Sequence, residues 1–567
     1  MNKRNRFFKI LFAVAAIIAV TVACGGGSGL ATDNGALRIV ADPTIQLLDS
    51  NGILSSCGVP YTIEYLGSVE MKLKVQDYST SNPGDVDVFW AASPIWLPGS
   101  FVVNKTPIMG SYVVFGVNPN IASQFGWNPV NGVYFNNIMQ ASNSRALSLG
   151  IASASQDDAA ANFNLAGLTA LKGTGEPLYA EDLGNPAITD PMKTFYSNVS
   201  LGSNHSGDLA TKFVADQLSG NPQLNSFVLP EAMAISVNQQ LTAKGASPMT
   251  VFYVKDAVGL QSFTMGYTKD SSDAKQESFN TLVKCLTSAD TQKKLQNLGF
   301  RAGGVGMKIE NPNTSVFNPA WGFDGTAEYL TVNLPKFPVI ETALNTYQLA
   351  WKKPSCTVYV LDFSPSMDPD GRAQLLAAMK LLLGPDAAKY TLQTGQNDST
   401  YAVTFADRIL SQYSVSGNDA ASLYAETPAD QLRYAPNDAK KENPLNPYDA
   451  NSLFGKIYYE PFGNATDIYG SVVYGLQLAV QNCRADQLPA VVFLTDGERT
   501  AGPKYSYLKD FVNDNNLQIR VYAILMGDAD EGVLAEITAL TKAGEPCDGR
   551  TGEDALVRCF RNIRGSN

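Results

Sequence analysis

The stretch from Val358 to Ser366 constrains the fold most, because it joins an apolar run to a polar loop. Four consecutive apolar residues, Val358 to Leu361, are typical of a strand that is buried on both faces in a parallel sheet. Asp362, Ser364 and Ser366 follow at alternate positions. Ligands of doubly wound α/β folds bind at this carboxyl edge of the sheet. One carboxylate and two hydroxyls are hard oxygen donors, which suit Mg²⁺, Mn²⁺ or Ca²⁺ rather than zinc.

Two later segments add oxygen donors in a consistent order. Gly463 to Gly470 is a polar loop that opens a helical run and contains Thr466, and Ala490 to Leu494 is a second apolar strand followed by Thr495-Asp496-Gly497. Together with the first loop, these segments closely resemble the von Willebrand factor A domain and its metal-ion-dependent adhesion site. The alternative is a set of turns and helix caps that align by chance.

The resemblance implies a Rossmann-like, doubly wound α/β domain over residues 353–567. It also implies a metal site whose ligands are Asp362, Ser364, Ser366, Thr466 and Asp496. Mg²⁺ (or Mn²⁺ or Ca²⁺) would keep one coordination position open, and a partner protein's Asp or Glu would fill it. A purely structural ion is the alternative for this site. The insertion 416–451 has no counterpart that we can assign in the family.

The N-terminus has the pattern of an export signal. Lys3, Arg4, Arg6 and Lys9 precede an apolar run that ends at Thr21-Val22-Ala23-Cys24, which is similar to a bacterial lipobox. We therefore predict a signal peptide over 1–23, lipidation of Cys24, a flexible tether over 24–35, and a location outside the cytoplasm on a lipid anchor. An uncleaved apolar anchor is the alternative.

Length and charge limit the remaining possibilities. A chain of 567 residues is too long for one hydrophobic core, so two or three domains are expected. The formal net charge of −11 argues against nucleic acid or anionic lipid surfaces as partners.

Residues 36–350 show strands alternating with helices, which predicts a second α/β unit. The segments that carry a resemblance are Tyr65-Leu66-Gly67-Ser68, the strand Asp85–Ser93 before Pro94, Thr106–Ser111, and the terminal stretch from Lys275 to Arg301. Their order resembles a type II periplasmic solute-binding protein. The resemblance implies two α/β lobes that close on a small solute, joined by crossings near 111–118 and 252–267.

Ligand contacts in such a cleft come from strand ends and helix N-termini. The candidates are Ser68, Ser93, Ser111, Ser153 and Ser155, and an ordinary helix cap or turn is the alternative for each. Asp157 and Asp158 stand near one expected helix start, where their charge would compete with an anionic ligand. Trp90 and Trp96 suit either stacking on a sugar or packing in the core.

Apart from Cys24, the chain has six cysteines: Cys57, Cys285, Cys356, Cys483, Cys547 and Cys559. An even number in an exported protein permits disulfides, although many pairings are possible. Cys547–Cys559 is the pairing that we predict, and six buried thiols are the alternative.

Enzyme activity has little support. The single histidine, His205, lies in a Gly/Ser/Asn-rich stretch and is expected to be a solvated loop residue. Metal-assisted hydrolysis is the residual enzyme hypothesis. Two binding functions remain. The chain is either a surface protein whose A domain engages a protein partner beside a cleft that binds a solute or serves as a scaffold, or the solute receptor of an ABC transport system with an accessory A domain.

Overall fold

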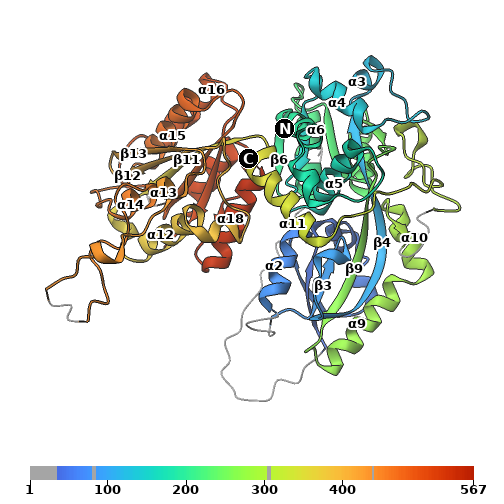
Figure 1. The fold of residues 1–567 in the computed structure, drawn as a ribbon, viewed down its shortest axis with the longest axis horizontal. Coiled ribbons are helices and arrows are strands. Elements are labelled where there is room, and N and C mark those ends of the chain that lie inside the picture. The colour runs from blue at the N-terminus through green and yellow to red at the C-terminus, as the bar shows by residue number, and fades with distance from the viewer. Residues whose placement is uncertain (1–34, 79–84, 303–307, 437–439, 498, 567) are drawn as a thin grey trace, which may run out of the picture.

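The computed structural model describes residues 35–78, 85–302, 308–436, 440–497 and 499–566. The predicted signal peptide, Cys24 and the tether up to residue 34 lie outside these residues. Within the described part, no helix combines the length and the apolar character needed to cross a bilayer. The chain forms two α/β units, one on each sheet (Figure 1).

The first unit is built on a ten-stranded sheet in the order β2-β1-β3-β9-β4-β7-β5-β6, with β8 and β10 also paired to β4. Its strands are β1 (Leu37–Ala41), β2 (Tyr61–Tyr65), β3 (Val88–Ala91), β4 (Val102–Val117), β5 (Leu149–Ala152), β6 (Val199–Ser203), β7 (Ser226–Pro230), β8 (Thr250–Phe252), β9 (Gly259–Thr268) and β10 (Arg301–Ala302).

Two long antiparallel strands, β4 and β9, divide this sheet into two lobes. β9 pairs with β3 of the first lobe, and β4 pairs with β7 of the second lobe. The crossing segments are therefore close to those predicted, although the first begins earlier, at Val102, and the second covers Gly259–Thr268.

Helices cover both faces of each lobe. The first lobe carries α1 (Gln46–Ser50), α2 (Ser68–Tyr78), α9 (Asp273–Leu286) and α10 (Ala289–Asn297), and the second carries α3 (Pro119–Gln124), α4 (Phe135–Asn143), α5 (Asp158–Lys172), α6 (Pro186–Ser197), α7 (Ser206–Gln217) and α8 (Glu231–Ala243). Local sequence sets these limits. The side chain of Asp157 caps the start of α5, and Gly173 ends the helix with a φ of 72°.

A buried ion pair fastens the end of the first unit to its second lobe. Arg301 Nη2 lies 2.7 Å from Glu231 Oε1 at the start of α8, and both side chains are fully buried. The same guanidinium donates hydrogen bonds to the carbonyl oxygens of Asp324 and Ala327. The segment that follows residue 308 is thereby held against the core of the second lobe.

The second unit contains a six-stranded sheet in the order β13-β12-β11-β14-β15-β16. Its strands are β11 (Ser355–Asp362), β12 (Ser399–Phe405), β13 (Ile409–Ser416), β14 (Leu488–Thr495), β15 (Arg520–Leu525) and β16 (Cys547–Asp548). All neighbouring pairs are parallel except β12 with β13. Val358 and Val360 pack into one core and Tyr359 and Leu361 into the other, so β11 is buried on both faces as predicted.

The helices of the second unit lie on both sides of its sheet (Figure 1). They are α12 (Asp370–Leu383), α13 (Ala420–Leu423), α14 (Leu453–Tyr458), α15 (Ile468–Asn482), α16 (Tyr505–Asp514), α17 (Glu531–Leu540) and α18 (Glu553–Ser566). The unassigned insertion 416–451 contributes α13, and its aromatic residues Tyr424 and Tyr448 pack against Phe454 of α14.

A linker helix, α11 (Phe337–Thr346), continues into a π-helical turn, Tyr347–Trp351, and joins the units. Trp96 of the first lobe contacts Phe337 of α11, and Tyr196 of the second lobe contacts Tyr347. The linker therefore packs on both lobes before the chain enters β11.

Three disulfides are present: Cys57–Cys285, Cys356–Cys483 and Cys547–Cys559. The predicted Cys547–Cys559 pairing is among them. Neither of the other bridges joins the two units, since the first lies within residues 36–350 and the second within the six-stranded unit. Such bridges persist in oxidising compartments.

We expect Arg301→Met to lower the free energy of unfolding of the first unit by about 3–5 kcal/mol, because Glu231 is left buried without its counter-charge. All five tryptophans precede residue 352, so tryptophan fluorescence in a urea titration follows this unit. Lys244→Met is the control, since Lys244 is exposed at the end of α8 in the same unit and its loss should cost less than about 1 kcal/mol. Equal effects of the two substitutions would contradict the role of the Arg301 pair.

Candidate functional sites

Four of the five predicted cleft serines gather where the two lobes meet, at a contact that we call the interlobe seam (Ser68, Ser93, Ser153, Ser155, Asp42, Asp157 and Asp158). All of these side chains are buried. Ser68 Oγ donates to Asp42 Oδ2 at 2.6 Å and accepts from Ala92 N at 2.7 Å. Ser153 and Ser155 share a hydrogen bond of 2.9 Å. The hydroxyls of Ser68, Ser153 and Ser155 are thus bonded within the protein.

The lobes touch directly along this seam. Val69 N of the first lobe donates to Gln156 O of the second at 3.3 Å. A Cβ atom at Gly67 would lie 2.4 Å from Gln156 O, so a glycine is required for the backbones to approach this closely. The structure is therefore that of a closed cleft.

Asp157 and Asp158 accept hydrogen bonds from donors at the seam that a bound anion would otherwise use. Asp157 accepts hydrogen bonds from Ser206 N and Ser206 Oγ at the N-terminus of α7. Asp158 accepts from Trp96 Nε1 of the first lobe at 2.5 Å and from Gln261 Nε2 of β9 at 3.0 Å. Backbone N–H groups that would bind an anion are already satisfied, which disfavours phosphate or sulfate at this point.

Burial changes the ionisation of these two groups. It raises the pKa of Asp157 to about 6, with Asp42 adding to the effect and hydrogen bonds from Ala160 and Ser206 opposing it. It raises the pKa of Asp158 to about 7, against the hydrogen bonds from Trp96 and Gln261. Both carboxyls are therefore more easily protonated than in water.

Two expectations from the sequence are corrected here. Ser111 lies on β4 but away from the hydrogen bonds of the seam, because its hydroxyl accepts from Ala232 N at the start of α8 at 3.3 Å. His205 is not a solvated loop residue. It is the N-cap of α7, its Nδ1 accepts from Asp208 N at 3.3 Å, and burial lowers its pKa. Trp96 packs in the core and holds Asp158, in agreement with the packing alternative.

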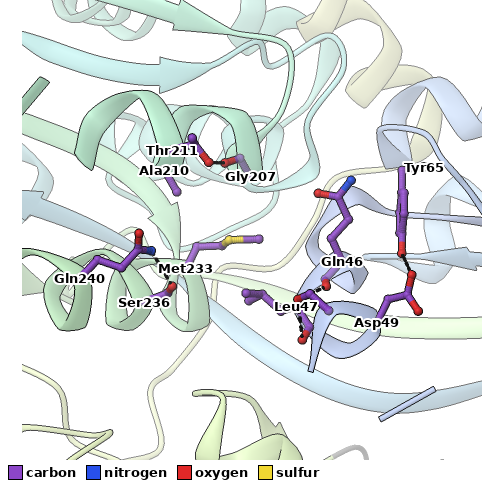
Figure 2. Close-up of a pocket in the computed structure, with 11 residues that line it drawn as sticks. Gln46, Leu47, Asp49, Tyr65, Gly207, Ala210, Thr211, Met233, Ser236 and Gln240 are labelled. Carbon is purple, nitrogen blue, oxygen red and sulfur yellow. Dashed lines mark hydrogen bonds between the residues drawn. The ribbon is translucent and has the colours of Figure 1, made fainter. Parts of the chain in front are cut away.

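A pocket of about 470 Å³ opens between the lobes beside the seam (Figure 2). The first lobe contributes Gln46, Leu47, Asp49, Ser50 and Tyr65, and the second contributes Gly207, Ala210, Thr211, Met233, Ser236 and Gln240. Figure 2 shows Asp49 bonded to Tyr65 on one side and Gln240 bonded to Ser236 on the other. These lining residues include one carboxylate, several amides and hydroxyls, and neither Lys nor Arg.

The predicted metal ligands of the second unit lie at the carboxyl edge of its sheet. β11 ends at Asp362, and β14, its parallel neighbour, ends one residue before Asp496. The strand order reverses here, since β12 lies on the other side of β11. Open α/β sheets bind ligands at such a reversal.

Hydrogen bonds fix the loop that follows β11. Asp362 Oδ1 accepts from Ser364 N at 2.8 Å and Oδ2 accepts from Thr495 Oγ1 at 2.5 Å. Ser364 Oγ and Ser366 Oγ lie 3.1 Å apart. Asp362 and Ser364 are buried, whereas Ser366 is exposed, so the cluster reaches solvent through Ser366.

The Thr466 loop lies beside the other two. Gly463 N donates to Phe363 O at 2.9 Å, which fastens this loop to the first. Thr466 N donates to Thr500 Oγ1 at 2.9 Å, and Thr500 N returns a bond to Thr466 O. Thr466 therefore stands between the loop after β11 and the loop after β14, and the three segments converge at one edge of the sheet.

The donor set is suited to a hard divalent cation. Burial raises the pKa of Asp362 to about 6, and the charge of Asp496 contributes to this rise because the two carboxylates lie near one another in a poorly solvated place. A cation would relieve this repulsion, and carboxylate and hydroxyl oxygens are its preferred ligands. Among the described residues, no group of three or more His, Cys, Asp and Glu side chains could hold a metal, so this site depends on its hydroxyls.

Some residues of these sites were not identified from sequence. Thr495 orients Asp362, and its position at the end of an apolar strand was the available signal. Gln46, Asp49 and Gln240 have no local signal, because each becomes part of the pocket only when the lobes pack together.

No protein-family model matches the chain, and no curated protein is similar to it in sequence. Solved structures that resemble about half of the chain are periplasmic binding proteins. The sulfate-binding protein SubI from Mycobacterium tuberculosis is 14% identical, with 54% of this chain and 95% of that one covered and a TM-score of 0.36. AfuA from Actinobacillus pleuropneumoniae, with fructose-6-phosphate bound, is 10% identical, with 55% and 97% covered and a TM-score of 0.38. Iron-bound HitA from Pseudomonas aeruginosa is 11% identical, with 55% and 97% covered and a TM-score of 0.36.

We expect the first unit to lose stability as the pH rises through 6 to 7. The folded protein holds protons on Asp157 and Asp158, whose pKa values are about 6 and about 7, when the unfolded chain has released them. The loss should be on the order of a few kcal/mol. Fluorescence-detected melting from pH 5 to pH 8 measures it, and Asp158→Asn should flatten the profile. A wild-type melting temperature that rises over this range would contradict the assignment.

Proposed function

We propose that this chain is an extracytoplasmic solute-binding protein whose first unit holds a small, uncharged, polyhydroxylated solute in the pocket between its lobes. The pocket lined from both lobes carries this proposal. Amide and hydroxyl groups pair with sugar or polyol hydroxyls, and Leu47 and Met233 offer apolar contact. The function corresponds to the solute receptor considered from sequence, with delivery to a transporter as its consequence.

The charge of the lining supports an uncharged ligand. Asp49 accepts hydrogen bonds from the hydroxyls of Tyr61 at 2.5 Å and Tyr65 at 2.9 Å, and would repel an anion. At the seam, Asp157 already occupies the N-terminus of α7. A neutral solute avoids both costs, because it brings no charge that has to be desolvated.

Export and anchoring belong to the same proposal. Three disulfides are compatible with an oxidising compartment. Lipidation of Cys24 would hold the protein at the membrane surface while the tether lets it stand clear of the bilayer. The chain acts as a binding protein rather than as an enzyme.

A second binding function is favoured by the convergence of Asp362, Ser364, Ser366 and Asp496 at the sheet edge. We propose that these residues and Thr466 bind Mg²⁺, Mn²⁺ or Ca²⁺, as in the A domain that the sequence resembles. A bound cation supplies a positive charge that attracts an acidic side chain of a partner protein. The protein's own contribution is to orient the oxygens: Thr495 holds one oxygen of Asp362, and Ser364 N holds the other.

For the solute, we expect neutral sugars or polyols to raise the melting temperature of the first unit by mass action, and phosphate and sulfate to leave it unchanged. Gln240→Ala should weaken binding of the stabilising compound about five- to tenfold, the effect of one lost hydrogen bond. Gln239→Ala is the matched control, because Gln239 is exposed on the same helix outside the pocket lining. Stabilisation by anions alone would overturn this proposal.

For the cation, isothermal titration of the full chain with Mg²⁺ or Mn²⁺ should show one site that Asp496→Ala abolishes. Asp514→Ala, at the exposed end of α16, should leave it intact. Acetate can stand in for the partner's carboxylate, and bound Mn²⁺ should broaden its proton resonance. If both variants bind Mn²⁺ as the wild type does, the cation lies elsewhere.

A further inference from the structure

The last helix of the chain, α18, contacts both lobes of the first unit. On one side, Arg561 Nε lies 3.1 Å from Glu70 Oε1 of α2, in the first lobe. On the other side, Gln156 Nε2 of the second lobe donates to Arg561 O at 2.7 Å. Arg561 of the six-stranded unit therefore forms an ion pair with the first lobe and accepts a hydrogen bond from the second lobe.

Further contacts extend this junction along α18. Asn204 Nδ2, which follows β6 of the second lobe, donates to Asn562 Oδ1 at 2.7 Å. A Cβ at Gly565 would lie 2.6 Å from Asn204 Cα, so the helix and the loop are in direct backbone contact. In Figure 1, α18 lies on the side of the six-stranded unit that faces β6 and α2.

The ion pair is in a buried place. Arg561 is 5% exposed and Glu70 is 9% exposed. Burial raises the pKa of the Glu70 carboxyl, and the charge of Arg561 opposes that shift. If Glu70 and Arg561 were separated while still buried, each charge would lose its partner. The pair therefore favours the arrangement in which α18 and α2 remain in contact at the seam.

The helix is fixed within its own unit. The Cys547–Cys559 disulfide joins it to β16, and Arg564 Nη1 bonds with Ser355 Oγ at 2.8 Å and with Asp398 Oδ2 at 3.2 Å. Leu556, Phe560 and Ile563 pack into the core of the six-stranded unit. α18 therefore moves with that unit rather than with either lobe.

We propose that α18 latches the two lobes of the first unit in the closed arrangement, so that the six-stranded unit controls opening of the cleft. Opening rotates α2 away from the Ser153–Asp157 loop, and α18 cannot follow both. Either the Glu70–Arg561 pair or the Gln156 and Asn204 bonds must break. Movement of the six-stranded unit would release the latch from outside the cleft.

The linker adds a second bridge on the same side. Lys72 Nζ of α2 lies 2.7 Å from Glu341 Oε1 of α11, while α11 also packs against α5 of the second lobe. The latch and the linker both lie away from the pocket lining, and α1, α7 and α8 carry most of that lining. A solute would therefore enter on one side of the seam while the latch holds the other.

The test measures lobe separation in the full chain without any ligand. Spin labels on unnatural amino acids at the exposed positions Ser56, in the first lobe, and Ser219, in the second, report the distance by pulsed electron resonance. Arg561→Gln and Glu70→Gln should each add a longer distance and raise the open fraction about tenfold or more, because each leaves one charge of a buried pair alone.

Arg558→Gln, on the exposed side of the same helix, is the control and should leave the distance unchanged. If Arg561→Gln fails to fold by circular dichroism, Gln156→Ala tests the latch with no charge left behind, and it should also raise the open fraction. Unchanged distances in the folded variants, or an equal change in Arg558→Gln, would overturn the latch. Its effect on solute uptake rests on the proposed function, whereas the distance measurement does not.

Discussion

Buried carboxylates at the carboxyl ends of parallel strands impose the main electrostatic constraint on both units. Desolvation disfavours the charged form of each, so the protein must supply donors, a counter-charge or a proton. At the interlobe seam, Asp158 is met by Trp96 Nε1 and Gln261 Nε2, donors that come from the first lobe and from the crossing strand. These hydrogen bonds to Asp158 therefore help to hold the two lobes together.

The six-stranded unit meets the same constraint differently. Thr495 and Ser364 satisfy both oxygens of Asp362, yet Asp496 remains close enough to raise the pKa of Asp362. The hydroxyls of Ser364 and Ser366 stand beside these carboxylates. At the interlobe seam, donors from the protein satisfy the carboxylates. At the carboxyl edge of the six-stranded sheet, the oxygens are arranged so that a divalent cation would stabilise them.

Two segments, the linker and α18, form the junction between the units. The linker leaves the first unit next to the seam, with Tyr347 against Tyr196, and α18 returns to the same region at Glu70 and Gln156. Segments far apart in sequence, near residues 70, 156, 347 and 561, meet there. Because these segments are in contact, a movement of one unit changes the contacts made by residues of the other.

Local sequence was informative where one element carries its own signal. The apolar run before Asp362 predicted a strand buried on both faces, and Val358 and Tyr359 do pack into opposite cores. Candidate seam residues were found because helix starts and strand ends have recognisable compositions. Ser111 and His205 were misplaced because their surroundings are supplied by α8 and α7, whose packing no local pattern describes.

The sequence by itself determined the alternation of strands and helices in both units and the oxygen-rich loops at Asp362, Thr466 and Asp496. These features arise from periodicity and from residue chemistry over a few positions. Only the tertiary structure decided that the cleft is closed by its own carboxylates, that a pocket lies beside the seam, and that Arg561 reaches Glu70. Each of these depends on residues hundreds of positions apart, and their proximity is set by the packing of whole lobes rather than by any local preference.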